Sequence, residues 1–314
     1  MGNEKVLKRE PELKPPTTFE EQIEILKSRG LVVENEACAY GILHKVNYYR
    51  LSAYLLPFQV YGSDSFRDGT RFNQIYRIYE FDQKLRNLIL YAIEPIEVLL
   101  RTQLAYYHSH KYGSEGYINP VNFESIRRHE RFIEEFNGAV EKNKKALFVK
   151  HHIDKYGRRF PIWVAVELFS FGMLSKFYAN MKINDQKDIA KKIFKTGPKQ
   201  LRSWLICVTD LRNRCAHYMR IYFHKLVNYP RLPNGPYALC SQRIFDIIYV
   251  MKYLFLNHDK WKNSVVRELE ALINEYSMDI QLRYIGFPEN WLELLEERPV
   301  SPRRMPQGRH KMSR

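Results

Sequence analysis

Residues 199–223 read KQLRSWLICVTDLRNRCAHYMRIYF, and neither Gly nor Pro occurs between Pro198 and Pro230. A stretch without helix breakers, with apolar residues three and four apart, predicts one amphipathic helix that continues through the whole segment. At about 100° per residue, one face of this helix forms an apolar stripe that suits a protein core. The stripe consists of Leu201, Trp204, Leu205, Val208, Leu211 and Cys215.

The opposite face of this predicted helix carries Asn213, His217 and Arg220. Arg212 lies at the edge of the apolar stripe, where an unpaired guanidinium is costly to desolvate, so we expect a carboxylate partner for it. On an ideal helix Arg212 and His217 are about 140° apart. Three arrangements would bring both to one phosphate: the Arg side chain wraps around the helix, the helix is distorted, or two copies of the chain face each other across a two-fold axis.

These residue types suit the cleavage of an RNA strand. A His with a pKa near its usual value of about 6.5 can take the proton of a ribose 2′-OH or donate one to the leaving 5′-oxygen. An Arg can bind the scissile phosphate through two parallel hydrogen bonds, and an Asn can orient the imidazole or the phosphate. No step of this scheme requires a metal ion. The spacing alone equally fits the solvated face of a core helix, because an Arg and a His five residues apart are common.

The composition indicates a globular, helix-rich and basic protein. Hydrophobic residues make up 45% of the 314 residues, and 22 Tyr and 18 Phe accompany only 14 Gly, which favours long helices packed through aromatic rings over a turn-rich β fold. The formal net charge of +15 is consistent with a polyanionic partner, although it does not distinguish RNA from DNA or a membrane surface.

Neither a metal site nor a membrane segment is indicated. The four Cys have no C-x-x-C spacing, and His151 and His152 have no neighbouring Cys and no H-E-x-x-H pattern, so we expect no metal and no cofactor. The first residues contain no apolar core of a signal peptide, and no run of 18 apolar residues occurs. We therefore expect a cytoplasmic protein without a membrane partner.

The pattern along the chain predicts one all-α domain over residues 18–296. Residues 1–17 are charged and Pro-bearing and predict a flexible arm, and residues 297–314 predict a disordered basic tail. Additional helices are expected before and after a central bundle. Residues 60–72 contain Asp68-Gly69 and fit either a small hairpin or a plain loop.

Two further groups of residues are candidates for the site. Glu94, Glu97 and Arg101 lie near Pro95 in the long helix predicted over residues 72–107. Either Glu94 or Glu97 holds Arg212 from a neighbouring helix and so poises the site, with Arg101 as a further supporting residue, or Glu97 and Arg101 form an ordinary surface ion pair. Glu167, in an apolar run, could join the same polar network. Tyr48, Tyr49 and Arg50 could stack on RNA bases, although such an aromatic run more often packs between helices.

Five ordered blocks of the sequence resemble the Abi-like proteins of the AbiD/AbiF type, which are bacterial abortive-infection factors with a HEPN ribonuclease domain. The blocks span residues 29–31, 47–58, 79–101, 161–178 and 203–220, so the resemblance covers roughly residues 18–225. It implies a helical HEPN bundle core, the active-site signature R-N-x-x-x-H at Arg212, Asn213 and His217, and a homodimer with a shared cleft. Glu97 and Arg101 match the acidic-then-basic helical block of the family.

The function that this resemblance implies is metal-independent cleavage of RNA. The chain would act in phage defence by abortive infection, or as a toxin restrained by a regulatory non-coding RNA or a protein antitoxin. In the family, H-x-R-[LI]-W-N commonly follows the signature; here Tyr222 and Phe223 depart from it, which leaves the role of positions after Arg220 open. Met219 occupies the place of a Tyr that partner enzymes modify in some related toxins. The alternative function is a non-catalytic RNA-binding module.

Overall fold

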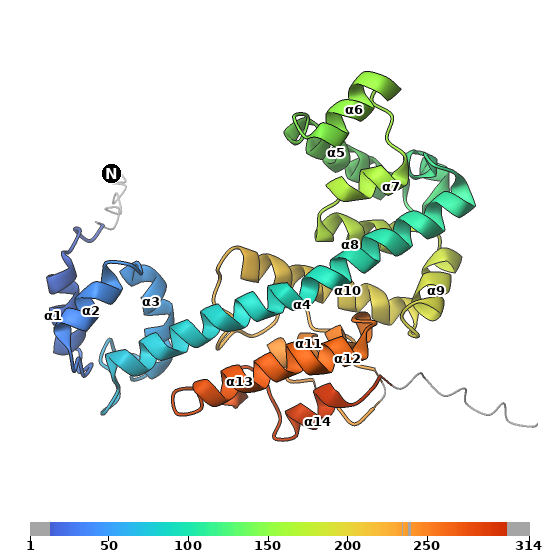
Figure 1. Ribbon diagram of the computed structural model, residues 1–314. Helices are drawn as coiled ribbons and strands as arrows, with labels where there is room; N and C mark the ends of the chain where they lie inside the picture. Colours follow the sequence, from blue (N-terminus) through green and yellow to red (C-terminus); the bar gives the residue numbers. More distant parts are fainter. Residues whose placement is uncertain (1–12, 234, 238–239, 300–314) are drawn as a thin grey trace, which may run out of the picture. The chain divides into compact units, whose positions relative to one another are not determined.

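The computed structural model describes residues 13–299 apart from residues 234, 238 and 239 (Figure 1). The chain divides into two compact units, residues 1–80 and 81–314, and the division falls within helix α4, Phe72–Tyr112. The described residues form helices and turns but no strand, which confirms the all-α prediction. One domain over residues 18–296 stays a prediction. Most of the expected arm and tail, residues 1–12 and 300–314, lies outside the described residues.

The first unit consists of short helices followed by the beginning of α4. Thr18 and Glu21 form the predicted capping box: the Thr18 hydroxyl accepts from the Glu21 amide at 3.2 Å, and the Glu21 carboxylate accepts from the Thr18 amide at 2.7 Å. Near residues 60–72, a single antiparallel bridge joins Gln59 and Phe66, so this turn does not extend into paired strands. Before α4 the helices are α1 Phe19–Ser28, α2 Glu36–Leu43, α3 Tyr48–Leu55 and η1 Leu56–Phe58.

The second unit contains the remainder of α4 and all later helices. Pro95 lies inside α4 without ending it. After α4 the helices are η2 Gly116–Ile118, η3 Pro120–Asn122, α5 Ile126–Lys142, α6 Leu147–Tyr156, α7 Ile162–Ala165, η4 Val166–Leu168, α8 Phe171–Asn180, α9 Ile183–Lys192, α10 Pro198–Ala216, α11 Ile244–Leu254, α12 His258–Lys260, η5 Trp261–Val266, α13 Arg267–Glu275, η6 Leu282–Tyr284 and α14 Trp291–Glu296.

Helix α10 lies in the core of the second unit, and α8, α9 and α11 pack against it. Its predicted apolar stripe, from Leu201 to Cys215, is buried. Trp204 is fully buried, and its indole N–H donates to the Arg231 carbonyl at 2.7 Å, so this aromatic anchor also satisfies its polar atom. The helix that carries the sequence motif is therefore held on several sides.

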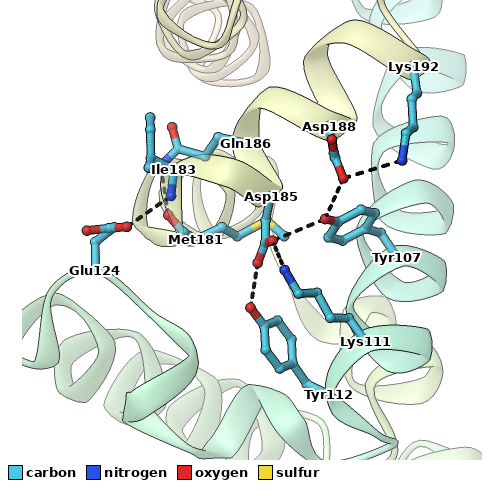
Figure 2. A network of polar contacts seen from close by, with 10 residues as sticks. All are labelled: Tyr107, Lys111, Tyr112, Glu124, Met181, Ile183, Asp185, Gln186, Asp188 and Lys192. Atoms are coloured by element: carbon cyan, nitrogen blue, oxygen red, sulfur yellow. Dashed lines mark hydrogen bonds and ion pairs between the residues drawn. The ribbon is translucent and has the colours of Figure 1, made fainter.

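A polar network around the buried Asp185 joins α9 to the C-terminal end of α4 (Figure 2). The Asp185 carboxylate accepts from the Tyr107 hydroxyl at 3.1 Å and from the Tyr112 hydroxyl at 2.7 Å, and it pairs with the Lys111 ammonium. Tyr107 also donates to Asp188 at 3.2 Å. Because a buried carboxylate is costly unless it is paired and hydrogen-bonded, this network fixes the direction in which α9 leads into α10.

Candidate functional site

Helix α10 ends within the motif, so the prediction of one unbroken helix through residues 199–223 is wrong. The last helical residue is Ala216, and His217 caps the helix. The Met219 amide donates to the Arg214 carbonyl at 2.9 Å and the Tyr218 amide to the Cys215 carbonyl at 3.0 Å, which is the hydrogen-bond pattern of a Schellman cap. Tyr218 has φ +57°, a left-handed conformation that usually calls for Gly. The motif therefore lies at a helix end, where the backbone turns away from the helix axis.

A buried carboxylate from α4 holds the chain directly after this turn. The Asp82 carboxylate accepts from the Ile221 amide at 3.2 Å and from the Tyr222 amide at 2.7 Å, and it pairs with the guanidinium of Arg86. All four residues are buried. The backbone amides that a longer helix would have bonded internally are thus satisfied by Asp82, which stabilises this helix end.

Asp82 and Arg86 were not among the residues predicted for the site. One signal was available, because Asp82 lies on the helical stripe of Ile78, Leu85 and Ile89, a place where a charged side chain is rarely buried without a partner. These two residues position the motif segment rather than contribute groups that could act on a substrate.

Four of the predicted site residues line one groove between α4 and α10. Glu94, Glu97 and Arg101 of α4 and Arg212 of α10 surround a space of about 280 Å³, with an apolar floor that includes Ile93. This brings together residues that are more than one hundred positions apart in the sequence. Acidic and basic groups of the predicted site thus converge in this groove.

Within this groove, Glu97 and Arg101 form a partly buried ion pair. The Arg101 guanidinium also donates to the carbonyls of Val166 and Glu167 at 2.8 and 3.0 Å, and its distance to the Glu167 carboxylate is 4.0 Å. Arg101 thus connects α4 to η4, and Glu167 joins the network mainly through its backbone. A guanidinium bound on several sides is a fixed element of the groove wall.

Arg212 is half-buried in the same groove but forms no hydrogen bond or ion pair within the described part of the chain. The carboxylate partner expected for it is absent there, since Glu97 pairs with Arg101 instead. An unpaired guanidinium next to an acidic wall keeps its donors available for the oxygens of an anionic ligand.

Asn213 and His217 are exposed and do not line this groove. Because His217 still caps α10, the angular separation of Arg212 and His217 that the sequence predicts persists in the structure. Arg220 lies beyond the helix end rather than on its polar face, and its guanidinium is 5.7 Å from the centre of the Phe223 ring. One chain thus presents Arg212 inside the groove and the imidazole outside it.

The titratable groups near the helix end differ in their chemical availability. The pKa of His224 is lowered to about 4, mainly by burial and further by the positive charges of Arg214 and Arg220. This imidazole is therefore neutral at pH 7. Burial raises the pKa of the Cys215 thiol to about 12, which leaves it a packing residue rather than a nucleophile. The exposed His217 is consequently the better candidate for proton transfer near the motif.

The predicted RNA-binding residues Tyr48, Tyr49 and Arg50 belong to α3 in the first unit. Tyr49 is 85% exposed and Arg50 is also exposed, so both side chains face solvent rather than the core of that unit. Their contact with RNA stays a prediction.

The described residues contain no cluster of three or more His, Cys, Asp or Glu side chains that could hold a metal ion. Their Cys residues are free thiols. None of the helices in the described ranges is both long and apolar enough to cross a lipid bilayer.

A family model described as "Abi-like protein" matches residues 41–223, more than half of the chain. The match includes α4, the groove residues and the motif at the end of α10. No curated protein and no solved structure matches the chain.

Proposed function

The chain belongs to the Abi-like protein family, and from that premise we propose that it is a metal-independent endoribonuclease that acts in phage defence by abortive infection. The observation that carries the proposal is the Arg212 guanidinium, which lies without a partner among the described residues in a groove beside the Glu97–Arg101 pair. In the same motif, an exposed imidazole caps the helix. Restraint by a regulatory RNA or a protein antitoxin would keep such an activity dormant.

The proposed reaction is a transesterification within the RNA strand. His217 accepts the proton of a ribose 2′-OH, the 2′-oxygen attacks the adjacent phosphorus, and the bond from phosphorus to the 5′-oxygen breaks. A protonated imidazole returns a proton to that leaving oxygen. The products are a 2′,3′-cyclic phosphate and a 5′-OH end. Arg212 binds the phosphate oxygens as their charge grows, and Asn213 orients the imidazole or the phosphate.

Glu97 and Arg101 act as positioning residues in this scheme. Their ion pair and the contacts of Arg101 with the backbone of η4 hold the wall against which Arg212 extends. Glu94 adds a second carboxylate to the groove, and Arg220 adds positive charge near the helix end. A homodimer in which two copies of α10 contribute to one cleft would bring an Arg212 and a His217 to the same phosphate.

The test is induced expression of the wild-type chain, His217→Ala and Arg212→Ala in cells that lack any cognate neighbouring genes. We expect growth arrest and RNA fragmentation with the wild type and neither with the two variants. His110→Ala, which removes another exposed imidazole of the second unit, is the matched control and should behave as the wild type does. The fragments should carry 2′,3′-cyclic phosphate and 5′-OH ends, and cleavage by the purified protein should persist in a chelator.

Two outcomes contradict the proposal. Equal growth arrest by the wild type and His217→Ala would mean that the motif does not cause the arrest. Chelator-sensitive cleavage that leaves 5′-phosphate ends would mean a different reaction. RNA binding without His217-dependent decay would favour the alternative, a non-catalytic RNA-binding module.

A further inference from the structure

Two adjoining grooves outside the candidate catalytic groove are rich in unpaired cations. The first, here called the loop groove, has a volume of about 520 Å³ and contains Lys199, Arg202, Ile206, Tyr229 and Arg231. The second, the helix groove, has a volume of about 370 Å³ and lies among α5, α8 and the first half of α10. Its walls include Arg128, Arg131, Phe132, Lys176, Phe177 and Arg202.

Arg202 and Ile206 line both grooves, so the two share a wall on α10. Both residues are exposed. Four exposed residues lie within about 60° of one another around the axis of α10 and form a single exposed stripe: Arg202, Ile206, Asn213 and His217. This stripe leads from the shared wall to the candidate catalytic end of α10 over about 16 Å. A ligand lying along the stripe would therefore reach His217.

The charge of the two grooves is strongly unbalanced. Arg128, Arg131 and Arg202 form no ion pair within the described residues, and the same holds for Lys199 and Arg231 of the loop groove. Among the residues that the structure describes, one carboxylate lines these grooves: Glu135, which pairs with Lys176 at 2.8 Å. Uncompensated guanidinium groups facing a common space repel one another and match an anion with several separated charges.

The loop groove also offers a ring on which a base can stack. Tyr229 of the loop groove is 51% exposed, whereas Phe132 and Phe177 of the helix groove are buried in the core. A positively charged groove with an exposed aromatic side chain is an arrangement with which proteins bind single-stranded nucleic acid. A duplex keeps its bases stacked inside and would leave the Tyr229 ring unused.

We propose that the loop groove and the helix groove hold single-stranded RNA, and that the exposed stripe of α10 directs the strand toward His217. The direction toward His217 and the choice of RNA over DNA rest on the proposed ribonuclease function, whereas the binding of a single-stranded nucleic acid in the grooves does not. Between Ile206 and His217, a distance of about 16 Å along the helix, a stacked strand with about 3.4 Å per nucleotide would place about five nucleotides. The phosphates lie against the arginines, and a base stacks on Tyr229.

The test measures RNA binding by fluorescence anisotropy with a labelled oligouridylate of about 12 nucleotides. All variants are made in the full chain in a His217→Ala background, so that cleavage does not consume the probe. Arg128→Gln, Arg131→Gln and Arg202→Gln should each weaken binding about 3- to 10-fold and reduce the slope of log affinity against log salt by about 0.7 per lost phosphate contact. Tyr229→Ala should weaken binding about 10-fold with an unchanged salt slope, because stacking releases no counterions.

The matched control is Arg127→Gln. Arg127 precedes Arg128 on α5, is also exposed, and lines neither groove, so its loss should leave affinity and salt slope as they were. Because all these side chains are exposed, thermal melting should be the same for every variant. Equal effects of Arg127→Gln and Arg128→Gln would overturn the proposal, since binding would then follow total charge. Equal competition by duplex RNA, by single-stranded DNA or by a mononucleotide would overturn single-stranded RNA as the occupant.

Failure of this proposal is distinguishable from failure of the proposed function. If the groove variants lose RNA binding while His217→Ala leaves RNA decay unchanged, the grooves hold RNA but the catalytic assignment is wrong. If His217 governs decay while Arg128, Arg131 and Arg202 leave RNA binding unchanged, the catalytic assignment stands and the grooves are not its RNA path.

Discussion

Asp82 of α4 holds the backbone that directly follows the motif. Its carboxylate is buried, pairs with Arg86 and accepts from the amides of Ile221 and Tyr222, which are 139 and 140 residues away along the chain. Removing one partner of a buried ion pair leaves an uncompensated charge, whereas removing an exposed charge costs little. The position of His217 thus depends on a contact made by a residue outside the motif.

We predict that Asp82→Ala lowers the free energy of unfolding by about 3–5 kcal/mol, because Arg86 and two amides then lose a buried partner. Asp82→Asn should cost less, since the amide oxygen still accepts a hydrogen bond although the charge is gone. Denaturant unfolding measures both, with the exposed neighbour Gln83→Ala as control. An Asp82→Ala protein as stable as Gln83→Ala would refute the role of this carboxylate.

At this scale the sequence predicted which side chains lie together better than it predicted the course of the backbone. The spacing of Arg212, Asn213 and His217 and the separate group Glu94, Glu97 and Arg101 were found from residue types, and the structure brings Arg212 to the three α4 residues. The helix end was missed because the left-handed residue of the cap is a Tyr rather than a Gly, and because the amides are captured by a residue distant in sequence. A local sequence pattern cannot predict a hydrogen bond to a residue that is distant in the sequence.

At the scale of elements, the C-terminal half of α4 packs on α8 and α9 through aromatic and polar groups that include a buried His108. The His108 ring lies 4.8 Å from the Tyr112 ring and 5.2 Å from the Phe177 ring, measured between centroids. Burial lowers the pKa of His108 to about 4. An unfolded chain restores the usual value of about 6.5, so the unfolded state binds more protons between these two pH values.

We therefore predict that stability falls as the pH drops from about 6.5 to about 4, by on the order of 3 kcal/mol from this imidazole alone. His108→Leu removes this titrating group and should make this part of the stability curve less steep, while His224, whose pKa is also lowered, retains its own contribution. His110→Leu, which alters an exposed imidazole on the same helix, should keep the wild-type slope. Unfolding at a series of pH values measures the difference, and identical slopes for the two variants would exclude His108 as the cause.

Periodicity predicted the long α4, the apolar stripe of α10 and the capping box of α1, because each depends on neighbours within a few residues. The periodicity did not predict which helices pack against one another. The Asp185 network illustrates why: its members come from residues 107–112 and 185–188, and each residue type alone is compatible with an exposed helix face (Figure 2). Burial of polar groups is decided only when two elements meet.

At the scale of the whole molecule, the geometry of the motif bears on how many chains would form one site under the proposed function. Arg212 lies in the groove with Glu97 and Arg101, while His217 lies outside this groove at the cap of α10. The sequence left three solutions open, and the structure retains the angular separation that motivated them. A two-fold arrangement would let the groove of one copy face the imidazole of a second copy, and every chain would then contribute to two identical sites.

This arrangement makes a quantitative prediction for mixtures of two inactive variants. If each site uses Arg212 of one copy and His217 of the other, a dimer of one Arg212→Ala chain and one His217→Ala chain keeps one intact site of two. With random pairing, half of the dimers are mixed, so an equimolar mixture should regain about a quarter of the wild-type RNA cleavage rate. Each variant alone should stay inactive.

Mixing Arg212→Ala with an Arg212→Ala/His217→Ala double variant supplies no intact Arg212 and is the control. No recovery in a mixture proven to exchange subunits would mean that one chain supplies both groups, through a rearranged Arg212 side chain or a helix end that changes when RNA binds.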